Sequence, residues 1–302
     1  MKTIRYSNPA DNRVELGILH GDDVFSVTHQ VPSWTDPVPM WHALRALGIT
    51  AAEAEAQLST GPCLSFADLE RQGRLLPPVV SPEVWASGVT YERSREARNA
   101  ETQIKDSVYD RVYVAERPEL FFKATYDRVV APGHPVALRS DSQWMVPEPE
   151  LCIVISAAGD LIGWTVGNDL SSRDIEGENP LYLPQAKVFA RSCSFGPVLL
   201  WNTGEQRPEE WDIELTIARD GVIAFQGSVS FSQFRRSFAT LIEYLRRDNP
   251  IQDGTVLMTG TGIVPPDEFT LANGDVVEIF IDAVGMLRNP VEAQVMSRSV
   301  EV

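Results

Sequence analysis

The chain has 302 residues, of which 43% are hydrophobic and 23% are charged, as in an ordinary globular protein. This length predicts one large or two modest domains, because a domain commonly takes about 100–200 residues. Acidic side chains outnumber basic ones by 42 to 26, which gives a formal net charge of −16. Such a surface repels phosphate backbones and anionic lipid, so the composition argues against nucleic acid and membranes as partners.

Cysteine usage and the N-terminal residues indicate a reducing compartment. Cys63, Cys152 and Cys193 lie far apart, and an odd number without a CxxC pair gives no disulfide framework. The segment from Met1 to Pro9 is too polar for a signal peptide. No apolar run reaches the roughly 18 residues that a membrane helix needs. We therefore expect a soluble, cytoplasmic protein.

The first elements predict a small α+β unit. Two apolar-rich segments within residues 14–27 flank a Gly21-Asp22-Asp23 turn, which is typical of a hairpin. Thr50 and Glu53 form a capping-box pattern, which predicts a helix to about Leu58. Prolines 77, 78 and 82 then interrupt regular structure. We place the boundary there, with a small N-terminal α+β domain at 1–78 and a catalytic domain at 79–302.

Strands dominate the second domain. The segments 151–166 and 213–225 each read as two strands around a glycine-containing turn, and 276–281 reads as a further strand. An Arg- and Glu-rich helix is expected over 92–103. Another helix is expected from apolar residues at helical spacing, namely Phe234, Phe238, Leu241, Ile242 and Leu245. This order predicts the α+β class, mainly β, with a mixed, mostly antiparallel core and peripheral helices.

The segment that carries most chemical information is Val146-Pro147-Glu148-Pro149-Glu150-Leu151. Side chains two apart on a strand face the same way, so Glu148 and Glu150 converge at a strand entry. The expected hairpin returns Asp169 to the same place. Three carboxylates without His or Cys suit Mg²⁺, with Mn²⁺ or Ca²⁺ as alternatives. A solvated acidic edge is the competing interpretation, and the residues alone leave both open.

Several ordered motifs between about Gly88 and Asn289 resemble the fumarylacetoacetate hydrolase (FAH) family. They are Phe121-Phe122-Lys123-Ala124-Thr125, the Glu148/Glu150 pair, Gly167-Asn168-Asp169-Leu170-Ser171-Ser172-Arg173-Asp174, Lys187, Gly196-Pro197, Thr259-Gly260-Thr261-Gly262 and Asn273-Gly274-Asp275. The resemblance implies a mixed β-roll core, a divalent metal held by Glu148, Glu150 and Asp169, and a homodimer or homotetramer.

One departure from the family bears on the reaction. Hydrolytic members resemble one another in a His, paired with an acid, that activates water, whereas the segment from Gly88 to Arg98 has no histidine. The residues from Ile175 to Lys187 are instead similar to the branch that dehydrates 2-keto-3-deoxy sugar acids. The resemblance therefore implies a hydro-lyase that converts a 2-keto-3-deoxy-pentonate from D-xylonate or D-arabinonate into 2-oxoglutarate semialdehyde.

Two residues are candidates for catalysis. Three carboxylates around a dication leave about one excess negative charge, which favours a nearby cation, and the family position of Lys187 makes it the first candidate. It would complement the substrate or shuttle a proton, whereas on sequence alone it reads as a surface lysine. Glu119 is a candidate acid or base, with a strand-edge cap as the alternative.

Four further residues are candidates for substrate binding. Thr261 lies in a glycine-flanked loop that offers a hydroxyl and backbone N–H groups, although such loops often merely turn. Glu176 lies where related hydrolases carry a substrate-contacting polar residue. Ser94 and Arg93 are candidates for a lid, with a solvated helix face as the alternative. Arg173 and Asp174 are expected to pair and to brace the metal loop.

Three functions from different classes follow from these observations. The first is the metal-dependent dehydratase, acting on a small 2-keto acid. The second is a C–C hydrolase of acylpyruvate or fumarylpyruvate type, or an oxaloacetate decarboxylase of the same family. The third is a keto-acid-binding or structural relative without turnover. The dehydratase needs no attacking water, so the missing histidine favours it.

Overall fold

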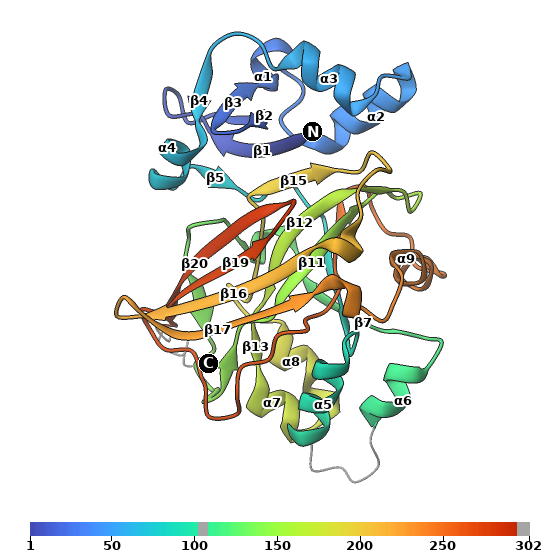
Figure 1. Ribbon diagram of the computed structural model, residues 1–302, viewed down its shortest axis with the longest axis vertical. Helices are drawn as coiled ribbons and strands as arrows, with labels where there is room; N and C mark the ends of the chain where they lie inside the picture. Colours follow the sequence, from blue (N-terminus) through green and yellow to red (C-terminus); the bar gives the residue numbers. More distant parts are fainter. Residues whose placement is uncertain (102–107, 295–302) are drawn as a thin grey trace, which may run out of the picture.

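The computed structural model describes residues 1–101 and 108–294. In this part of the chain a long mixed sheet, a five-stranded sheet and a two-stranded ribbon form the framework, and helices surround them (Figure 1). The predicted α+β, mainly β class with peripheral helices is therefore confirmed.

The N-terminal unit contains a hairpin, further short strands and short helices. Its elements are β1 (Lys2–Ser7), β2 (Val14–His20), β3 (Asp23–Ser26), α1 (Val27–Gln30), α2 (Pro37–Leu47), α3 (Ala51–Leu58), β4 (Cys63–Ser65), α4 (Phe66–Arg71) and β5 (Leu75–Leu76). The predicted β2–β3 hairpin and the capping box of α3 are both confirmed, since the Thr50 side chain accepts from Glu53 N and the Glu53 side chain accepts from Thr50 N.

The long sheet runs from the N-terminal unit into the second half of the chain. Beyond β1 it contains β15 (Val198–Trp201), β12 (Leu161–Asp169), β11 (Pro149–Ile155), β18 (Thr255–Met258), β6 (Val84–Gly88) and β7 (Glu119–Ala124), with β14 (Cys193–Phe195) and β8 (Val129–Val130) off this path. β1 pairs with β15, with Lys2 opposite Leu200. The division of the chain at residue 78 stays a prediction.

The five-stranded sheet lies across the long one (Figure 1). Its strands are, in order, β17 (Val222–Ser230), β16 (Asp212–Arg219), β19 (Val276–Ile281), β20 (Gly285–Ala293) and β9 (Val136–Leu138). The ribbon pairs β10 (Met145–Val146) with β13 (Ser171–Ser172). The predicted hairpins β11–β12 and β16–β17 are confirmed, as is the strand at 276–281.

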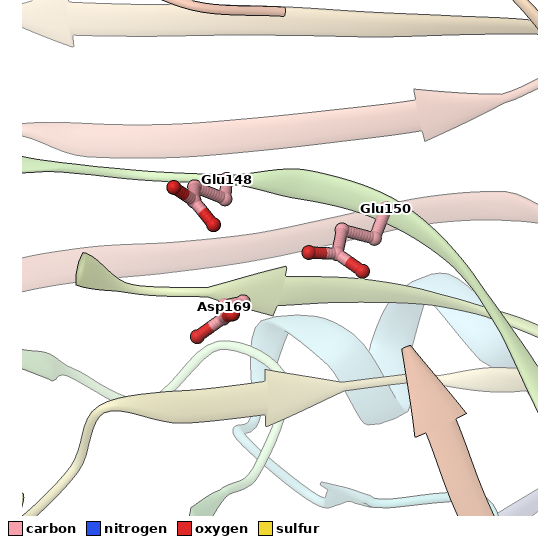
Figure 2. A group of neighbouring side chains, drawn as sticks. All are labelled: Glu148, Glu150 and Asp169. Carbon is pink, nitrogen blue, oxygen red and sulfur yellow. The ribbon is translucent and has the colours of Figure 1, made fainter. Parts of the chain in front are cut away.

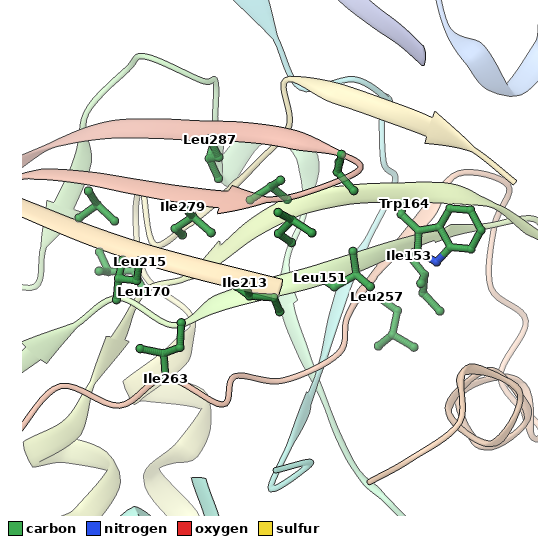
Figure 3. Close-up of a cluster of buried hydrophobic side chains, with 14 of the residues drawn as sticks. Leu151, Ile153, Trp164, Leu170, Ile213, Leu215, Leu257, Ile263, Ile279 and Leu287 are labelled. Atoms are coloured by element: carbon green, nitrogen blue, oxygen red, sulfur yellow. The ribbon is translucent and has the colours of Figure 1, made fainter. Parts of the chain in front are cut away.

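The main hydrophobic core fills the space between the two sheets (Figure 3). β16 alternates exposed and buried residues and turns Ile213 and Leu215 inward, where they join Leu151 and Ile153 of β11. Every residue of β11 is buried, as expected for a central strand covered on both faces. Each such Leu or Ile contributes about 1.5–3 kcal/mol, so the core fixes the strands that carry the acidic residues.

Beyond the N-terminal unit, the helices lie mostly at the end of the sheets where β11 begins and β12 ends (Figure 1). They are α5 (Glu92–Glu101), α6 (Val108–Val114), α7 (Arg173–Glu178), α8 (Leu183–Lys187) and α9 (Phe238–Arg246), with short 3-10 turns η1 (Tyr126–Arg128), η2 (Pro180–Tyr182), η3 (Pro208–Glu210) and η4 (Phe231–Gln233). α5 is as predicted up to Glu101, and the rest of the predicted 92–103 helix lies outside the described residues.

The amphipathic helix begins later than its apolar spacing predicts. Phe234 follows η4 and stacks on Phe231, with ring centroids 4.6 Å apart, instead of starting a helix. α9 starts at Phe238 because the Ser237 side chain accepts a hydrogen bond from Thr240 N and caps it. The inclusion of Phe234 in the helix was therefore wrong, whereas the buried face of Leu241, Ile242 and Leu245 is as expected.

Candidate metal centre and active site

The β11–β12 hairpin brings the three acidic residues together (Figure 2). Glu150 lies opposite Gly167 in the ladder, and Asp169 N donates a 3.0 Å hydrogen bond to Glu148 O. One carboxylate oxygen from each of Glu148, Glu150 and Asp169 lies within 4.8 Å of the others, and all three residues are buried. Burial rejects the alternative of a solvated acidic edge.

Lys187 lies against two of these carboxylates. It is the last residue of α8 and is buried. Its Nζ is 2.5 Å from Glu148 Oε2 and 3.1 Å from Asp169 Oδ2, and it donates to Ser171 Oγ at 2.6 Å. The structure thus places Lys187 in the acidic cluster and rejects the surface-lysine alternative.

A second buried lysine, which the sequence analysis gave no role, supports the same cluster. Lys123 lies on β7, and its Nζ is 2.5 Å from Asp169 Oδ1. It also donates to the backbone carbonyls of Leu170, at 2.9 Å, and of Lys187, at 2.6 Å. One ammonium group therefore ties the end of β12 to α8. Its place in the Phe-Phe-Lys motif was the only sequence signal.

Two arginines complete the cationic surroundings of Glu148. Arg173 Nη2 is 2.8 Å from Glu148 Oε1, and Arg98 Nη2, from α5, is 3.6 Å from the same oxygen. The expected Arg173–Asp174 pair is wrong, because neighbouring residues on a helix face different directions. Asp174 instead accepts from Ser142 Oγ and Gln143 N, both at 2.6 Å.

The surroundings shift the pKa values of Glu148 and Glu150 in opposite directions. Burial would raise the pKa of Glu148, but Lys187, Arg173 and Arg98 together hold it below its usual value. Burial raises the pKa of Glu150 well above its usual value, and the negative charges of Asp169 and Glu148 add to that rise. The one hydrogen bond that the described residues give the Glu150 carboxylate comes from Gly260 N, at 2.5 Å. Glu148 is thus ionised at neutral pH. Glu150 forms no ion pair with any described residue, and the charge of Lys187 offsets only a small part of the rise in its pKa.

This donor set fits a hard divalent cation. It consists of carboxylate oxygens alone, which Mg²⁺ and Ca²⁺ prefer. A dication among the three groups would also give Glu150 the positive partner that the described residues do not supply. The cluster can therefore hold the expected Mg²⁺, while the individual ligand assignments stay predictions.

Binding of Mg²⁺ is expected to release protons and to weaken as the pH falls. Since burial and its acidic neighbours raise the pKa of Glu150, this group holds a proton at a higher pH than an ordinary carboxyl, and a ligand must be ionised. The affinity therefore falls as the pH drops through that raised pKa. Calorimetry in two buffers of different ionisation enthalpy measures the release; the same binding heat in both would contradict the expectation.

Glu119 borders the cluster. It is the first residue of β7 and lies opposite Gly88 of β6. A Cβ at position 88 would overlap Glu119 Oε2, so the glycine makes room for this carboxyl. Burial raises the pKa of Glu119, and the nearby charges of Arg98 and Lys187 offset part of the rise. These neighbours place Glu119 beside the acidic cluster, as a group suited to exchange a proton.

Glu176 and Glu119 line the same cavity. Its volume is about 380 Å³, and its wall includes residues of α6 and α8. Glu176 lies on α7 with 1% of its surface exposed, and it forms an ion pair with Arg98. Because Arg98 also contacts Glu148, the cavity borders the acidic cluster. The structure thus brings Glu176 to the site.

The other three predicted binding residues differ in position. Thr261 is buried next to Gly260, and its hydroxyl is 3.2 Å from both Ile263 N and Ile263 O. Ser94 is buried on α5 and donates to Tyr91 O at 2.8 Å. The Arg93 side chain is 59% exposed and faces Glu96 at 3.9 Å, as in the solvated-face alternative. A substrate contact by any of them stays a prediction.

The comparisons with known proteins place this chain in a family. Residues 83–292 match the family model described as fumarylacetoacetate (FAA) hydrolase C-terminal. The chain belongs to this family, as its motifs predict.

Its relatives include two named dehydratases. The chain is 47% identical over 222 residues, 72% of its length and 74% of the relative's, to 2-dehydro-3-deoxy-D-arabinonate dehydratase of Saccharolobus solfataricus. It is 48% identical over 214 residues to a probable 2-keto-3-deoxyxylonate dehydratase of Haloferax volcanii, covering 71% and 73% of the two chains.

A solved structure shares the whole fold. It is 2-keto-3-deoxy-D-arabinonate dehydratase complexed with magnesium and 2,5-dioxopentanoate, with a TM-score of 0.82, 36% identity, and coverage of 97% of this chain and 99% of that chain. The predicted FAH-type fold is therefore confirmed. Separately, no helix in the described ranges 1–101 and 108–294 is long and apolar enough to span a membrane.

Proposed function

We propose that this protein is a magnesium-dependent dehydratase that converts a 2-keto-3-deoxy-pentonate into 2-oxoglutarate semialdehyde. The observation that carries the proposal is the buried trio Glu148, Glu150 and Asp169, with Lys187 Nζ 2.5 Å from one carboxylate and 3.1 Å from another. The relatives named above support the substrate class, because 2,5-dioxopentanoate is another name for the semialdehyde.

Different residues of the site would stabilise negative charge and transfer protons during the reaction. Glu148, Glu150 and Asp169 would hold Mg²⁺, which supplies Lewis acidity that makes the C3 proton of a bound 2-keto acid more acidic. Lys187 places a positive charge beside the trio, where the negative charge of an enolate develops. It is also the second candidate for moving a proton, after Glu119.

Glu119 has the properties of the proton-transfer group. In its ionised form it takes the C3 proton as the C–H bond breaks, and its raised pKa makes it a stronger base than an ordinary carboxylate. The protonated form then gives a proton to the C4 hydroxyl, which leaves as water. Loss of the C3 proton and the C4 hydroxyl leaves a C3=C4 double bond. A proton then leaves C5 and another is added at C3, which gives a C4=C5 enol with its hydroxyl on C5. This enol takes up a proton at C4 and loses its O–H proton to become the aldehyde. No water attacks carbon in this sequence.

The histidines support this choice over hydrolysis. All four lie in the described residues, and none contacts the acidic cluster. His134, the one nearest in sequence to the cluster, is 3.3 Å from Gly73 O on an exposed loop, and His42 pairs with Asp253 at 3.1 Å. The imidazole that hydrolytic members use to activate water has no counterpart here.

Three broader assignments belong to the same proposal. We propose a cytoplasmic enzyme that acts as a homodimer or homotetramer, with a small N-terminal domain at 1–78 and a catalytic domain at 79–302. Light scattering of the purified chain measures the assembly, and a mass of a single chain would contradict it.

The test is turnover with matched substrates, with Mg²⁺ and with EDTA. Formation of the semialdehyde from 2-keto-3-deoxy-xylonate or 2-keto-3-deoxy-arabinonate, lost with EDTA and restored by Mg²⁺, is the expected result. Release of an acid from an acylpyruvate, or of CO₂ from oxaloacetate, without dehydration of the sugar acids would instead support the C–C hydrolase or the oxaloacetate decarboxylase. Binding of keto acids without turnover of any of them would indicate the non-enzymatic relative.

A further inference from the structure

The cavity beside the acidic cluster has two carboxyl groups in its wall. Glu119 and Glu176 both line it, together with mainly apolar residues of α6, η2 and α8. Glu119 interacts electrostatically with Lys187 and Glu148, and Arg98 joins Glu176 to Glu148. Two residues of the cavity wall are therefore linked to the acidic trio, Glu119 by charge and Glu176 through Arg98. We call Glu119 and Glu176 the acidic wall.

The acidic wall has hydrogen-bond acceptors without donors. Within the described part of the chain, Arg98 pairs with Glu176 Oε1, but Glu176 Oε2 is buried and accepts no hydrogen bond. None of the hydrogen bonds found among the described residues reaches the carboxyl of Glu119 either. A buried acceptor without a donor is costly, and a ligand that brings an O–H group relieves that cost.

The positive charge near the wall is largely matched already. Arg98 is shared between Glu148 and Glu176, so it has no excess charge for a ligand. Arg117, at the rim of the cavity, is exposed and lies over the ring of Tyr244 at 5.1 Å. The inner wall thus offers a ligand acceptor oxygens and negative charge.

We infer that the acidic wall selects 2-keto acids with a hydroxylated tail and rejects those with a second carboxylate. This inference rests on the proposed function, in which the keto-acid head lies at the acidic trio and the tail extends into the cavity. A tail hydroxyl donates to Glu176 Oε2, whereas a tail carboxylate offers only acceptors and meets a like charge. Glu176 is then a specificity-determining residue for the sugar acid.

Two probes of equal chain length test the inference. 5-Hydroxy-2-oxopentanoate and 2-oxoglutarate share the keto-acid head and differ only in a tail hydroxyl or carboxylate, and pyruvate supplies the head alone. Calorimetry with saturating Mg²⁺ is expected to show at least about tenfold weaker binding of 2-oxoglutarate than of the hydroxy acid, because like charges in a desolvated site repel. Equal affinities in the unmodified protein would overturn the inference.

The variant Glu176→Gln removes the charge and adds an N–H donor. It is expected to narrow the preference for the hydroxy acid over 2-oxoglutarate by about tenfold. Because Arg98 joins Glu176 to Glu148, the pyruvate affinity of each variant is the reference against which the affinities of both longer probes are compared. Glu178→Gln is the matched control, because Glu178 lies on the same helix but is exposed. An unchanged preference in Glu176→Gln, or the same change in Glu178→Gln, would overturn the inference.

One further outcome separates this inference from the proposed function. If none of the three keto acids binds in the presence of Mg²⁺, the site for the keto-acid head is absent. Both the proposed function and the inferred selectivity of the acidic wall would then be wrong. If pyruvate binds but the two longer probes bind with equal affinity, only the inferred selectivity of the acidic wall would be wrong.

Discussion

Glu150→Gln is expected to abolish turnover without destabilising the metal-free protein. The substitution removes one of three carboxylates from the trio, and Mg²⁺ affinity should fall by more than about 100-fold, because loss of a mere supporting partner already costs about 10–100-fold. Yet Glu150 forms no ion pair with the described residues, and its pKa is raised well above the usual value. Calorimetry measures the affinity, and a thermal melt in EDTA measures stability.

The sign of the stability effect follows from linkage. Because the pKa of Glu150 is higher in the folded protein than in the unfolded chain, this group costs stability at any pH above its unfolded value. Glutamine keeps the volume and removes that cost, so the melting temperature in EDTA should stay equal or rise. A clear fall would show that Glu150 is held by a favourable interaction and would contradict the electrostatic account.

Glu148→Gln is the informative comparison. Its carboxylate is the shared partner of Lys187, Arg173 and Arg98, and breaking a buried pair by removing one member costs about 3–5 kcal/mol. Metal affinity should fall as in Glu150→Gln, but the metal-free protein should melt at a clearly lower temperature. Equal melting of the two variants would mean that the cations around Glu148 stabilise nothing.

The sequence could predict the acidic trio because its geometry is local. Glu148 and Glu150 are two residues apart at a strand entry, and one hairpin carries Asp169 back to them, so alternation and a turn suffice. The same reasoning gave the β16–β17 hairpin and the capped helix α3. Hairpins and helix caps depend on residues that lie close together in sequence.

The cations around the trio could not be predicted in this way. Lys123 comes from β7 and Arg98 from α5, and only tertiary packing brings them to the carboxylates. Periodicity cannot tell a buried lysine from an exposed one, and the Arg-rich pattern of α5 reads equally as a solvated face. Arg93 is in fact exposed on that helix, whereas Arg98 turns inward. Helix amphipathicity becomes informative only once the partner surface is known.

Lys187→Met is expected to lower kcat by about 10²–10⁴-fold, within the range for removal of a group that acts on a proton or a developing charge. Metal affinity should change little or increase, because the substitution removes a positive charge that lies 2.5 Å from Glu148 Oε2 and 3.1 Å from Asp169 Oδ2. Steady-state kinetics at saturating Mg²⁺ gives kcat and KM, and calorimetry gives the metal affinity.

Lys187→Arg distinguishes charge from position. A guanidinium keeps the positive charge but cannot place a compact ammonium between Glu148, Asp169 and Ser171. If charge alone matters, Lys187→Arg should recover most of the activity that Lys187→Met loses; if the position of Nζ matters, both variants should stay slow. A change in KM with kcat intact in both would show that Lys187 binds substrate equally in the ground and transition states, and its assignment to the chemical step would then be wrong.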